Sequence, residues 1–492
     1  MGLNALRSPF NIPRPMMSRT NSLVIVVLLW AAVYLPALGS LAVKGEEGRR
    51  ILPGIAMLES GNYLVPQVGG EAYFRKPPLI NWLVAASFKI FGTRNEWTAR
   101  LPSAISVLAV AIAFVTVARA SLGPRGSTIA AIIWLTNIGI IEKGRLIEIE
   151  GLYASLCGLA ITFWLSFWDQ KKSAWLVWIP ASIFLGLGLL AKGPVHLLFF
   201  YGVVIATLWA ARSWRTLFHP AHFVGLLIMV GIFAAWAIPF AHTAGSALAT
   251  TKWSNQFTGR LKGSDFQFLR WVRNIPQGLL YLLPWTIFLP LVRFDIFSEE
   301  KDRQFARALV WGAGVPFVLV SLVPGSIPRY AMPALVPGCW LLAMTLCAEN
   351  VSWPGWLGGK TFSFKARRRA VVAIAILACI GIWTYAAAIV PKMQKRQRVR
   401  RLAAQIDATV PRSEPLYALD PNYQPIFFYV HSNLVYASEV SDLPPDAVYL
   451  LVRPQREDEV VRSNRWSPRQ PHRALPPLTD YRKETILLLK IE

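Results

Sequence analysis

Long apolar segments separated by short polar loops make up most of the first 391 residues. A bilayer core of about 30 Å is crossed by roughly 20 helical residues, and eleven segments approach that length. They lie at about 22–43, 101–119, 127–141, 151–168, 174–191, 193–211, 221–241, 277–296, 306–325, 330–348 and 369–391. The pattern predicts a mainly α-helical, polytopic membrane protein with about eleven transmembrane helices, and thirteen as the upper limit.

Two regions depart from this pattern. Between Pro53 and Gly92 the chain is apolar only in patches, which favours amphipathic helices lying at the membrane interface. After Pro391 a basic, helix-like stretch is followed by short β-like runs, PLYAL, NLVYA, AVYLLV and TILLLKI. We therefore expect a membrane domain over residues 1–391, with a long first outer loop at 44–100, and a small soluble α/β domain over 392–492.

Composition supports membrane residence and excludes a nucleic-acid partner. Hydrophobic residues make up 54% of the chain and charged residues 16%, and the mean hydropathy is +0.41; soluble proteins carry about 25% charged residues. The net charge is +24, but residues 392–492 hold 16 basic and 12 acidic residues, so most of the excess lies in the membrane part. Basic residues in short loops orient helices and meet lipid headgroups, and no basic–aromatic binding module is present.

The basic loops predict a cytoplasmic N-terminus, because the loops that would then face inward are all basic. With an odd number of spans, the 44–100 loop and the tail lie on the opposite side. Several unusual polar groups fall on that same outer side. They are Glu46-Glu47, Arg75-Lys76, Arg145 with Glu148 and Glu150, Lys192, Arg260 and Arg329-Tyr330. Their common location predicts an extracytoplasmic cavity, with carboxylates for acid–base chemistry and cations for an anionic group.

Each group also has a structural explanation. The adjacent glutamates could be the solvated start of a helix, and the basic pair before Pro77 could hold lipid headgroups. Arg145 and Glu150 could form a structural ion pair. Lys192 could simply extend its ammonium group towards water.

A series of short motifs occurs in a specific order between about residues 20 and 345. The motifs are Glu46-Glu47-Gly48-Arg49, GNYLVPQVGGEAYFRKPPLINW, FGTRNEWTARLPSA, GRLIEIEGL, LLAKGPV, YLLPWTIFLP and SIPRYAMPALVP. The set resembles the ArnT-like and protein-mannosyltransferase-like branch of the GT-C glycosyltransferases, which use polyprenyl-phosphate-linked sugars. The family opens its first outer loop with Asp-Glu, whereas this chain has Glu46-Glu47.

The resemblance implies a GT-C fold and an inverting sugar transfer from a polyprenyl-phosphate donor to a lipid A-like lipid, a protein or an envelope glycan. It also implies a bacterial inner membrane location, a site that faces the periplasm, and no tightly bound cofactor. Some relatives hold a metal beside an acidic residue that precedes the KPP lysine. Because Arg75 occupies that position here, we expect no metal.

The resemblance also assigns roles to individual residues. Glu46 stands at the catalytic acidic position, with Glu47 as the alternative base and Glu150 assisting near donor or acceptor. Lys76 matches the lysine that binds the donor phosphate, and we expect three more groups to join it, Arg260, Arg329 and Tyr330. Supporting roles fall to Arg49, Arg75, Arg145 and Lys192.

Two other classes of function remain open. A polytopic lipid or sugar transporter, or a flippase, would also combine many helices with intramembrane charges. It would usually spread polar residues through the membrane midplane and repeat its halves, which this chain does not do. A sugar-lipid-binding homologue without catalysis is the third alternative, because Glu46 replaces the usual aspartate.

Overall fold

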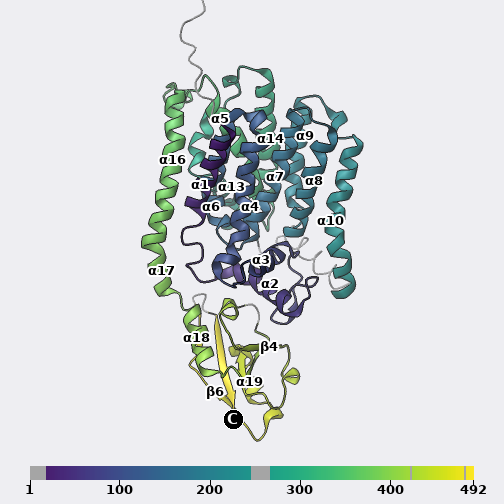
Figure 1. Ribbon diagram of the computed structural model, residues 1–492, viewed down its shortest axis with the longest axis vertical. Helices are drawn as coiled ribbons and strands as arrows, with labels where there is room; N and C mark the ends of the chain where they lie inside the picture. The colour runs from purple at the N-terminus through teal and green to yellow at the C-terminus, as the bar shows by residue number, and fades with distance from the viewer. Residues whose placement is uncertain (1–17, 245–265, 422–423, 481–483) are drawn as a thin grey trace, which may run out of the picture.

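The computed structural model describes residues 18–244, 266–421, 424–480 and 484–492. Its upper part in Figure 1 is a bundle of roughly parallel and antiparallel helices, and its lower part is a small sheet with flanking helices. The bundle helices are α1 (Arg19–Tyr34), α4 (Glu96–Thr116), α5 (Arg119–Thr136), α6 (Ile138–Gly144), α7 (Ile149–Asp169), α8 (Ala174–Ala191), α9 (Val195–Ala210), α10 (Pro220–Ala244), α14 (Glu300–Leu322), α15 (Leu335–Cys347) and α16 (Phe364–Thr384).

The bundle has the surface of a multi-pass membrane protein. Seven helices in the described part of the chain are long and apolar enough to cross a membrane, and α1, α3 (Leu79–Phe91) and α9 are shorter apolar helices. The two outermost helices in Figure 1, α10 and α16, expose large apolar side chains such as Leu227 and Leu377. Such faces would be unfavourable in water and suit lipid.

The expected count of eleven spans is not confirmed, and two expected spans are interrupted. The 127–141 segment is divided at Asn137, whose extended backbone separates α5 from α6. Residues 277–296 do not form a continuous helix. Helices α12 (Phe268–Val272) and α13 (Asn274–Leu280) are followed by a turn and by the 3₁₀ helix Trp285–Leu291. Proline lacks the amide hydrogen that a helix interior needs, so Pro284 and Pro290 interrupt the segment despite its hydropathy. The first helix likewise ends at Tyr34, well before residue 43.

The 44–100 segment lies against one end of the bundle (Figure 1). It contains the 3₁₀ turn Gly45–Glu47, α2 (Gly48–Ser60), a hairpin of β1 (Gln67–Val68) and β2 (Glu71–Ala72), and then α3. The stretch predicted to form amphipathic helices thus contains two of them. Both α2 and α3 end at a glycine with positive φ, Gly61 and Gly92, as is common at helix C-termini.

The C-terminal region, residues 392–492, extends from α17 (Val390–Arg396), which continues α16. All four β-like runs predicted there are strands. The elements are α18 (Val399–Thr409), β3 (Pro415–Leu419), β4 (Asn433–Ala437), β5 (Tyr449–Val452), α19 (Pro454–Val461), β6 (Pro471–Arg473), β7 (Leu478–Thr479) and β8 (Thr485–Ile491). The strand order is β4-β3-β5-β8-β6, with β7 pairing β8; β4, β3 and β5 are parallel, and β8 runs antiparallel to β5.

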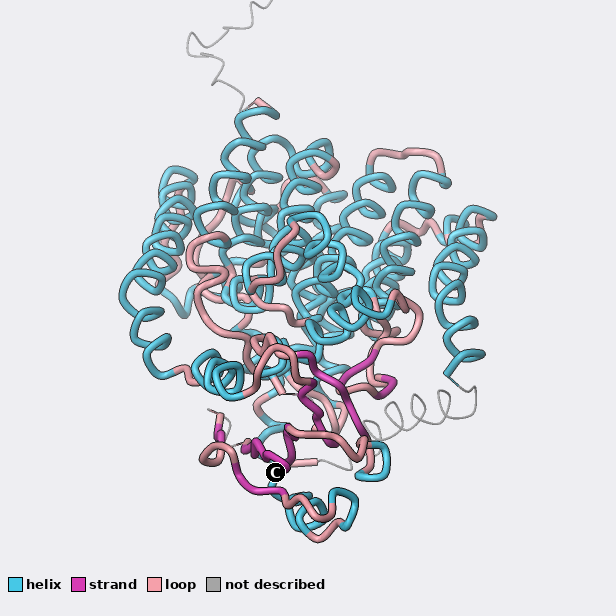
Figure 2. Tube along the Cα trace, turned by 60° about the horizontal axis from the view of Figure 1, so that its bottom comes forward, coloured by secondary structure: helices cyan, strands magenta, loops and turns pink. Residues whose placement is uncertain are grey.

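Polar contacts fasten the C-terminal region to the membrane-proximal segments. The Tyr429 hydroxyl donates to Glu96 Oε1 at 2.8 Å and accepts from the Val43 amide at 2.6 Å. Arg400 also pairs with Glu96. Figure 2, in which the bottom of the molecule is turned towards the viewer, shows the strands beneath the helical bundle. The sheet is therefore held beside the 44–100 segment.

Candidate active site

Glu46 lies in the 3₁₀ turn at the start of the 44–100 segment and is held by two arginines. Arg49 Nη1 donates to Glu46 Oε1 at 2.8 Å, and Arg50 Nη2 approaches Oε2 at 3.4 Å. Arg50 also donates to the Tyr73 hydroxyl at 2.9 Å. The Glu46 side chain keeps 34% of its surface exposed, so it is oriented by cations and still accessible to a substrate.

Glu47, expected as a second catalytic carboxylate, has a different position. Its side chain is 1% exposed and forms a two-pronged pair with Arg100, both contacts measuring 2.8 Å. Its oxygens also accept from the amides of Lys44 and Ile147. Glu47 is therefore buried and fully engaged, and its contacts anchor the turn that carries Glu46. This arrangement favours a structural role for Glu47 over the expected catalytic one.

A second charged cluster surrounds Glu150, in the first turn of α7. Lys192 Nζ lies 3.2 Å from Glu150 Oε1, and Arg329 Nε lies 3.1 Å from the same oxygen. The Lys192 ammonium also sits 4.4 Å from the centre of the Tyr330 ring, a cation–π contact. Burial lowers the pKa of Lys192 below its ordinary value, while Glu150 opposes this shift.

Lys143, at the end of α6, extends this cluster. Its ammonium lies 2.8 Å from Glu142 and 2.9 Å from Glu148, and Arg329 reaches Glu148 at 4.0 Å. Burial tends to lower the pKa of Lys143, but Glu148 and Glu142 outweigh it and raise the pKa. Lys143 therefore stays protonated, and Lys143 and Arg329 share the Glu148 carboxylate.

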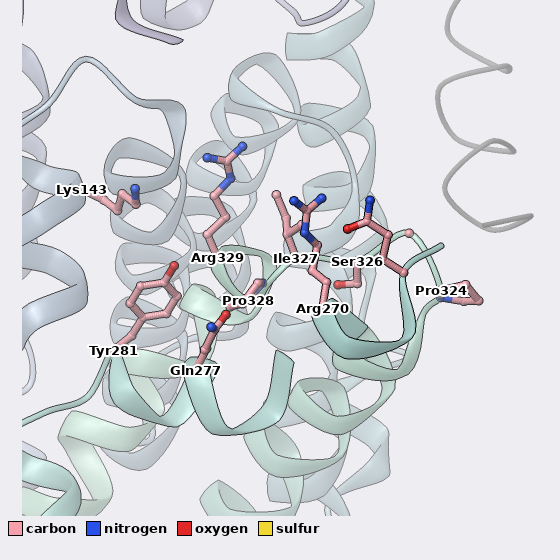
Figure 3. A pocket seen from close by; sticks show the side chains of 11 residues that line it. Lys143, Arg270, Gln277, Tyr281, Pro324, Ser326, Ile327, Pro328 and Arg329 are labelled. Atoms are coloured by element: carbon pink, nitrogen blue, oxygen red, sulfur yellow. The ribbon is translucent and has the colours of Figure 1, made fainter. Parts of the chain in front are cut away.

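A cavity of about 670 Å³ opens beside these cations. Lys143, Arg270, Tyr281 and Arg329 line it, together with backbone of the turn before Arg329. In Figure 3 the guanidinium groups of Arg270 and Arg329 extend in the same direction, with Lys143 and Tyr281 to one side. The Gly139 amide donates to the Tyr281 carbonyl at 2.8 Å, which holds that wall against α6.

The Glu46 turn lies within electrostatic range of the Glu150 cluster. Arg50, which contacts Glu46, interacts electrostatically with both Glu150 and Lys192. Glu46 in turn interacts with Arg329 at the cavity wall. An accessible carboxylate is thereby placed near a cavity lined by cations, an arrangement suited to moving a proton and stabilising an anion.

The remaining predicted residues have mixed placements. Lys76 is half-buried and Arg75 exposed in the turn before α3. Arg145 does not join the cluster, because its guanidinium donates to the carbonyls of Val33 and Pro36 and so braces the end of α1. The alternative in which it pairs with Glu150 is wrong as well. Arg260 lies outside the described residues.

Several residues of the site were not singled out from the sequence. Lys143, Arg270 and Tyr281 line the cavity, and Arg100 holds Glu47. For Arg100 a signal existed, since it lies within the ARLPSA motif. In the described ranges no three His, Cys, Asp or Glu side chains are grouped as metal ligands would be.

Comparison with solved structures identifies the fold. ArnT from Cupriavidus metallidurans bound to undecaprenyl phosphate superposes with a TM-score of 0.70 over 96% of this chain and 98% of that one, at 16% identity. The same protein in its apo state gives a TM-score of 0.67. The fold is that of ArnT.

Sequence comparisons agree with the ArnT-like fold. Residues 75–238 match the family described as dolichyl-phosphate-mannose-protein mannosyltransferase. Undecaprenyl phosphate-alpha-4-amino-4-deoxy-L-arabinose arabinosyl transferases from Pseudomonas fluorescens and Pseudomonas aeruginosa are 23% and 25% identical over 67% of this chain. The match spans 60% of each relative's length. The resemblance to the ArnT-like and mannosyltransferase-like branch is confirmed.

Proposed function

We propose that this chain is an inverting membrane glycosyltransferase that moves a sugar from a polyprenyl-phosphate donor to an acceptor outside the cytoplasm. The observation that carries the proposal is the partly exposed Glu46, held by Arg49 and Arg50, together with a cation-lined cavity whose Arg329 lies within electrostatic range of it. The ArnT-like fold and the arabinosyl transferase relatives support the donor class.

In the proposed reaction the acceptor's hydroxyl or amine attacks the sugar carbon that carries the phosphate. A bond forms between them as the bond to the phosphate oxygen breaks, and polyprenyl phosphate leaves with the electron pair. Glu46 takes the proton from the acceptor. Lys143, Arg270 and Arg329 face the cavity where the phosphate's negative charge develops, and Lys76 joins them by the motif match. A single displacement inverts the sugar carbon.

Glu150 has a positioning role in this proposal. It holds Lys192 and Arg329 through one oxygen, so it fixes the cations beside the donor rather than taking a proton itself. The proposed location is the bacterial inner membrane, with Glu46 facing the periplasm. The acceptor is a lipid A-like lipid, a protein or an envelope glycan.

Reconstitution of the full chain in liposomes with a panel of polyprenyl-phosphate sugars tests the proposal. Release of polyprenyl phosphate and transfer to an envelope extract are measured. Loss of a general base costs about 10²–10⁴-fold, so we expect Glu46→Gln to lower transfer by at least about 100-fold. Glu59→Gln is the matched control, because Glu59 is exposed and pairs only with Arg94 among the described residues.

The other functional classes give different outcomes. Movement of intact donor between leaflets without cleavage would identify a flippase. Binding of donor without turnover by the wild type would identify an inactive homologue. Equal transfer by Glu46→Gln and the wild type would refute the assignment of the base.

A further inference from the structure

The C-terminal sheet has the strand order that creates ligand sites in open α/β folds. Its first strand, β3, lies between the next two, β4 and β5, and all three are parallel. Ligands bind in such sheets outside the carboxyl ends of the strands, where the strand order reverses. Here that place lies beyond β3 and β5, and Asp420 and Arg453, which follow these strands, form an ion pair there.

A crevice of about 170 Å³ lies next to this place, at the carboxyl ends of β3 and β4, between the sheet and the 44–100 segment. Asp420 and Ser438, at the ends of β3 and β4, form one wall. Arg49, Tyr73 and Arg75 are among the residues that form the opposite wall. The crevice therefore exists only where two parts of the chain, far apart in sequence, meet.

Close packing shapes the crevice. Gly70, at the hairpin tip, has φ +80°, and a Cβ there would come within 2.7 Å of the Tyr436 Cβ. Ser438 Oγ donates to Glu71 Oε1 at 3.0 Å across the junction. Asp420 adopts φ +38°, a left-handed conformation that is uncommon for residues other than glycine and is often associated with functional sites. The hairpin is thus fitted to the strand ends rather than resting loosely on them.

The crevice connects directly to the proposed base. Arg49, in its wall, donates to Glu46 at 2.8 Å. Tyr73, also in its wall, accepts from Arg50, which contacts the other Glu46 oxygen. A molecule in the crevice would therefore be separated from Glu46 by Arg49 on one route and by Tyr73 and Arg50 on the other.

The lining favours a neutral polyhydroxyl ligand. Arg49 and Arg75 are matched in number by Glu71 and Asp420. Arg49 and Asp420 are each also paired with an opposite charge, Glu46 and Arg453, so the crevice carries no strong excess of either charge. Guanidinium donors, carboxylate acceptors and the Ser438 hydroxyl match sugar hydroxyls, which both donate and accept. Tyr73 adds an aromatic surface for the apolar face of a sugar ring.

We propose that this crevice binds the saccharide part of the acceptor and presents its reacting group to Glu46. The inference rests on the proposed transferase function and narrows its acceptor to a molecule that carries an uncharged sugar.

The test uses purified full-length protein on an array of envelope saccharides, each present in a neutral and a phosphorylated form. Arg75→Ala removes exposed donors from the crevice, and Ser438→Trp places a large ring in it. Loss of a charged hydrogen bond costs about ten-fold or more in affinity, so we expect both variants to weaken binding of a neutral saccharide at least about ten-fold. Arg462→Ala, at an arginine 83% exposed on α19's end, is the control and should bind normally.

Donor cleavage by water, assayed on the same preparations, separates the two proposals. We expect Ser438→Trp, whose residue lies outside the proposed donor site, to keep donor cleavage and to lose saccharide binding and transfer. Three outcomes would overturn the inference: no saccharide binding by the wild type, binding of phosphorylated forms only, or unaltered binding by both variants. If the donor is still turned over in these cases, the proposed transferase function stands. Saccharide binding without any donor turnover by the wild type would overturn both.

Discussion

Substitution by glutamine should affect the two adjacent glutamates differently: it should lower the thermal stability of the protein at Glu47 but not at Glu46. Glu47→Gln keeps the shape of the side chain but removes its charge, and this leaves the Arg100 guanidinium buried without its counterion. Both side chains are at most 3% exposed. Breaking one partner of a buried ion pair costs about 3–5 kcal/mol.

Other contacts of the Glu47–Arg100 pair show which part of the structure this loss of stability affects. Arg100 also donates to the carbonyls of Leu38 and Leu41, and Glu47 accepts from the Ile147 amide. The pair therefore fixes the chain between α1 and the Glu46 turn. We expect the loss of charge to loosen that turn and to reduce transfer as a consequence of reduced stability.

The assay is thermal unfolding in detergent, followed by tryptophan fluorescence, for Glu46→Gln, Glu47→Gln and the double variant Glu47→Gln/Arg100→Met. For a chain of this size a 3–5 kcal/mol loss lowers the Tm by roughly 3–10 °C. Glu47→Gln should show that drop and Glu46→Gln almost none, because Glu46 is partly exposed. Replacing both buried charges should restore part of the Tm, because no charge is left unpaired while the carbonyls of Leu38 and Leu41 lose their donor. An unchanged Tm in Glu47→Gln combined with lost transfer would refute the reasoning and make Glu47 the base.

Two further predictions concern the cavity and the C-terminal region. Arg270→Ala should raise the donor KM about ten-fold or more with little change in Tm, because Arg270 is an exposed cation that lines the cavity. Initial rates measured against donor concentration give the KM, and Arg273→Ala, at another exposed arginine, is the control. Equal KM values in the two variants would contradict the prediction. Burial tends to raise the pKa of Asp407, but hydrogen bonds from His431 and Ser432 outweigh it and lower the pKa. Its contribution to stability is therefore present above the unfolded value of about 3.9 and is lost as pH falls through the lower folded pKa. The Tm difference between wild type and Asp407→Asn should accordingly shrink from pH 6 to pH 3, and a constant difference would argue against this role.

The strands of the C-terminal region could be placed from sequence because their signal is local. PLYAL, NLVYA and TILLLKI coincide with β3, β4 and β8, since short apolar runs bounded by polar or turn residues suffice to define a strand. Their order could not be predicted. The pairing of β5 with both β3 and β8 depends on long-range packing that no local pattern records.

Hydropathy misplaced the 277–296 segment for a related reason. Hydropathy counts apolar side chains but not the amide hydrogens that Pro284 and Pro290 lack.

Only part of the candidate site could be predicted from the sequence. Motif order located Glu46, Glu150, Lys192 and Arg329. In contrast, the partner of Glu47 lies 53 residues away, and the wall residues Lys143 and Arg270 come from two helices, α6 and α12, that are far apart in sequence.

The junction between the 44–100 segment and the sheet has a consequence for biosynthesis. Arg75 is made early and Asp420 late, with about 345 residues between them. At about 5–20 residues per second the ribosome needs roughly 20–70 s to cover that distance. The cavity walls from Lys143 to Arg329 are complete before then, so a nascent or truncated chain could hold a donor but would lack one wall of the crevice. Under the proposed acceptor role of the crevice, only chains whose C-terminal region has been completed and has reached the 44–100 segment would bind an acceptor.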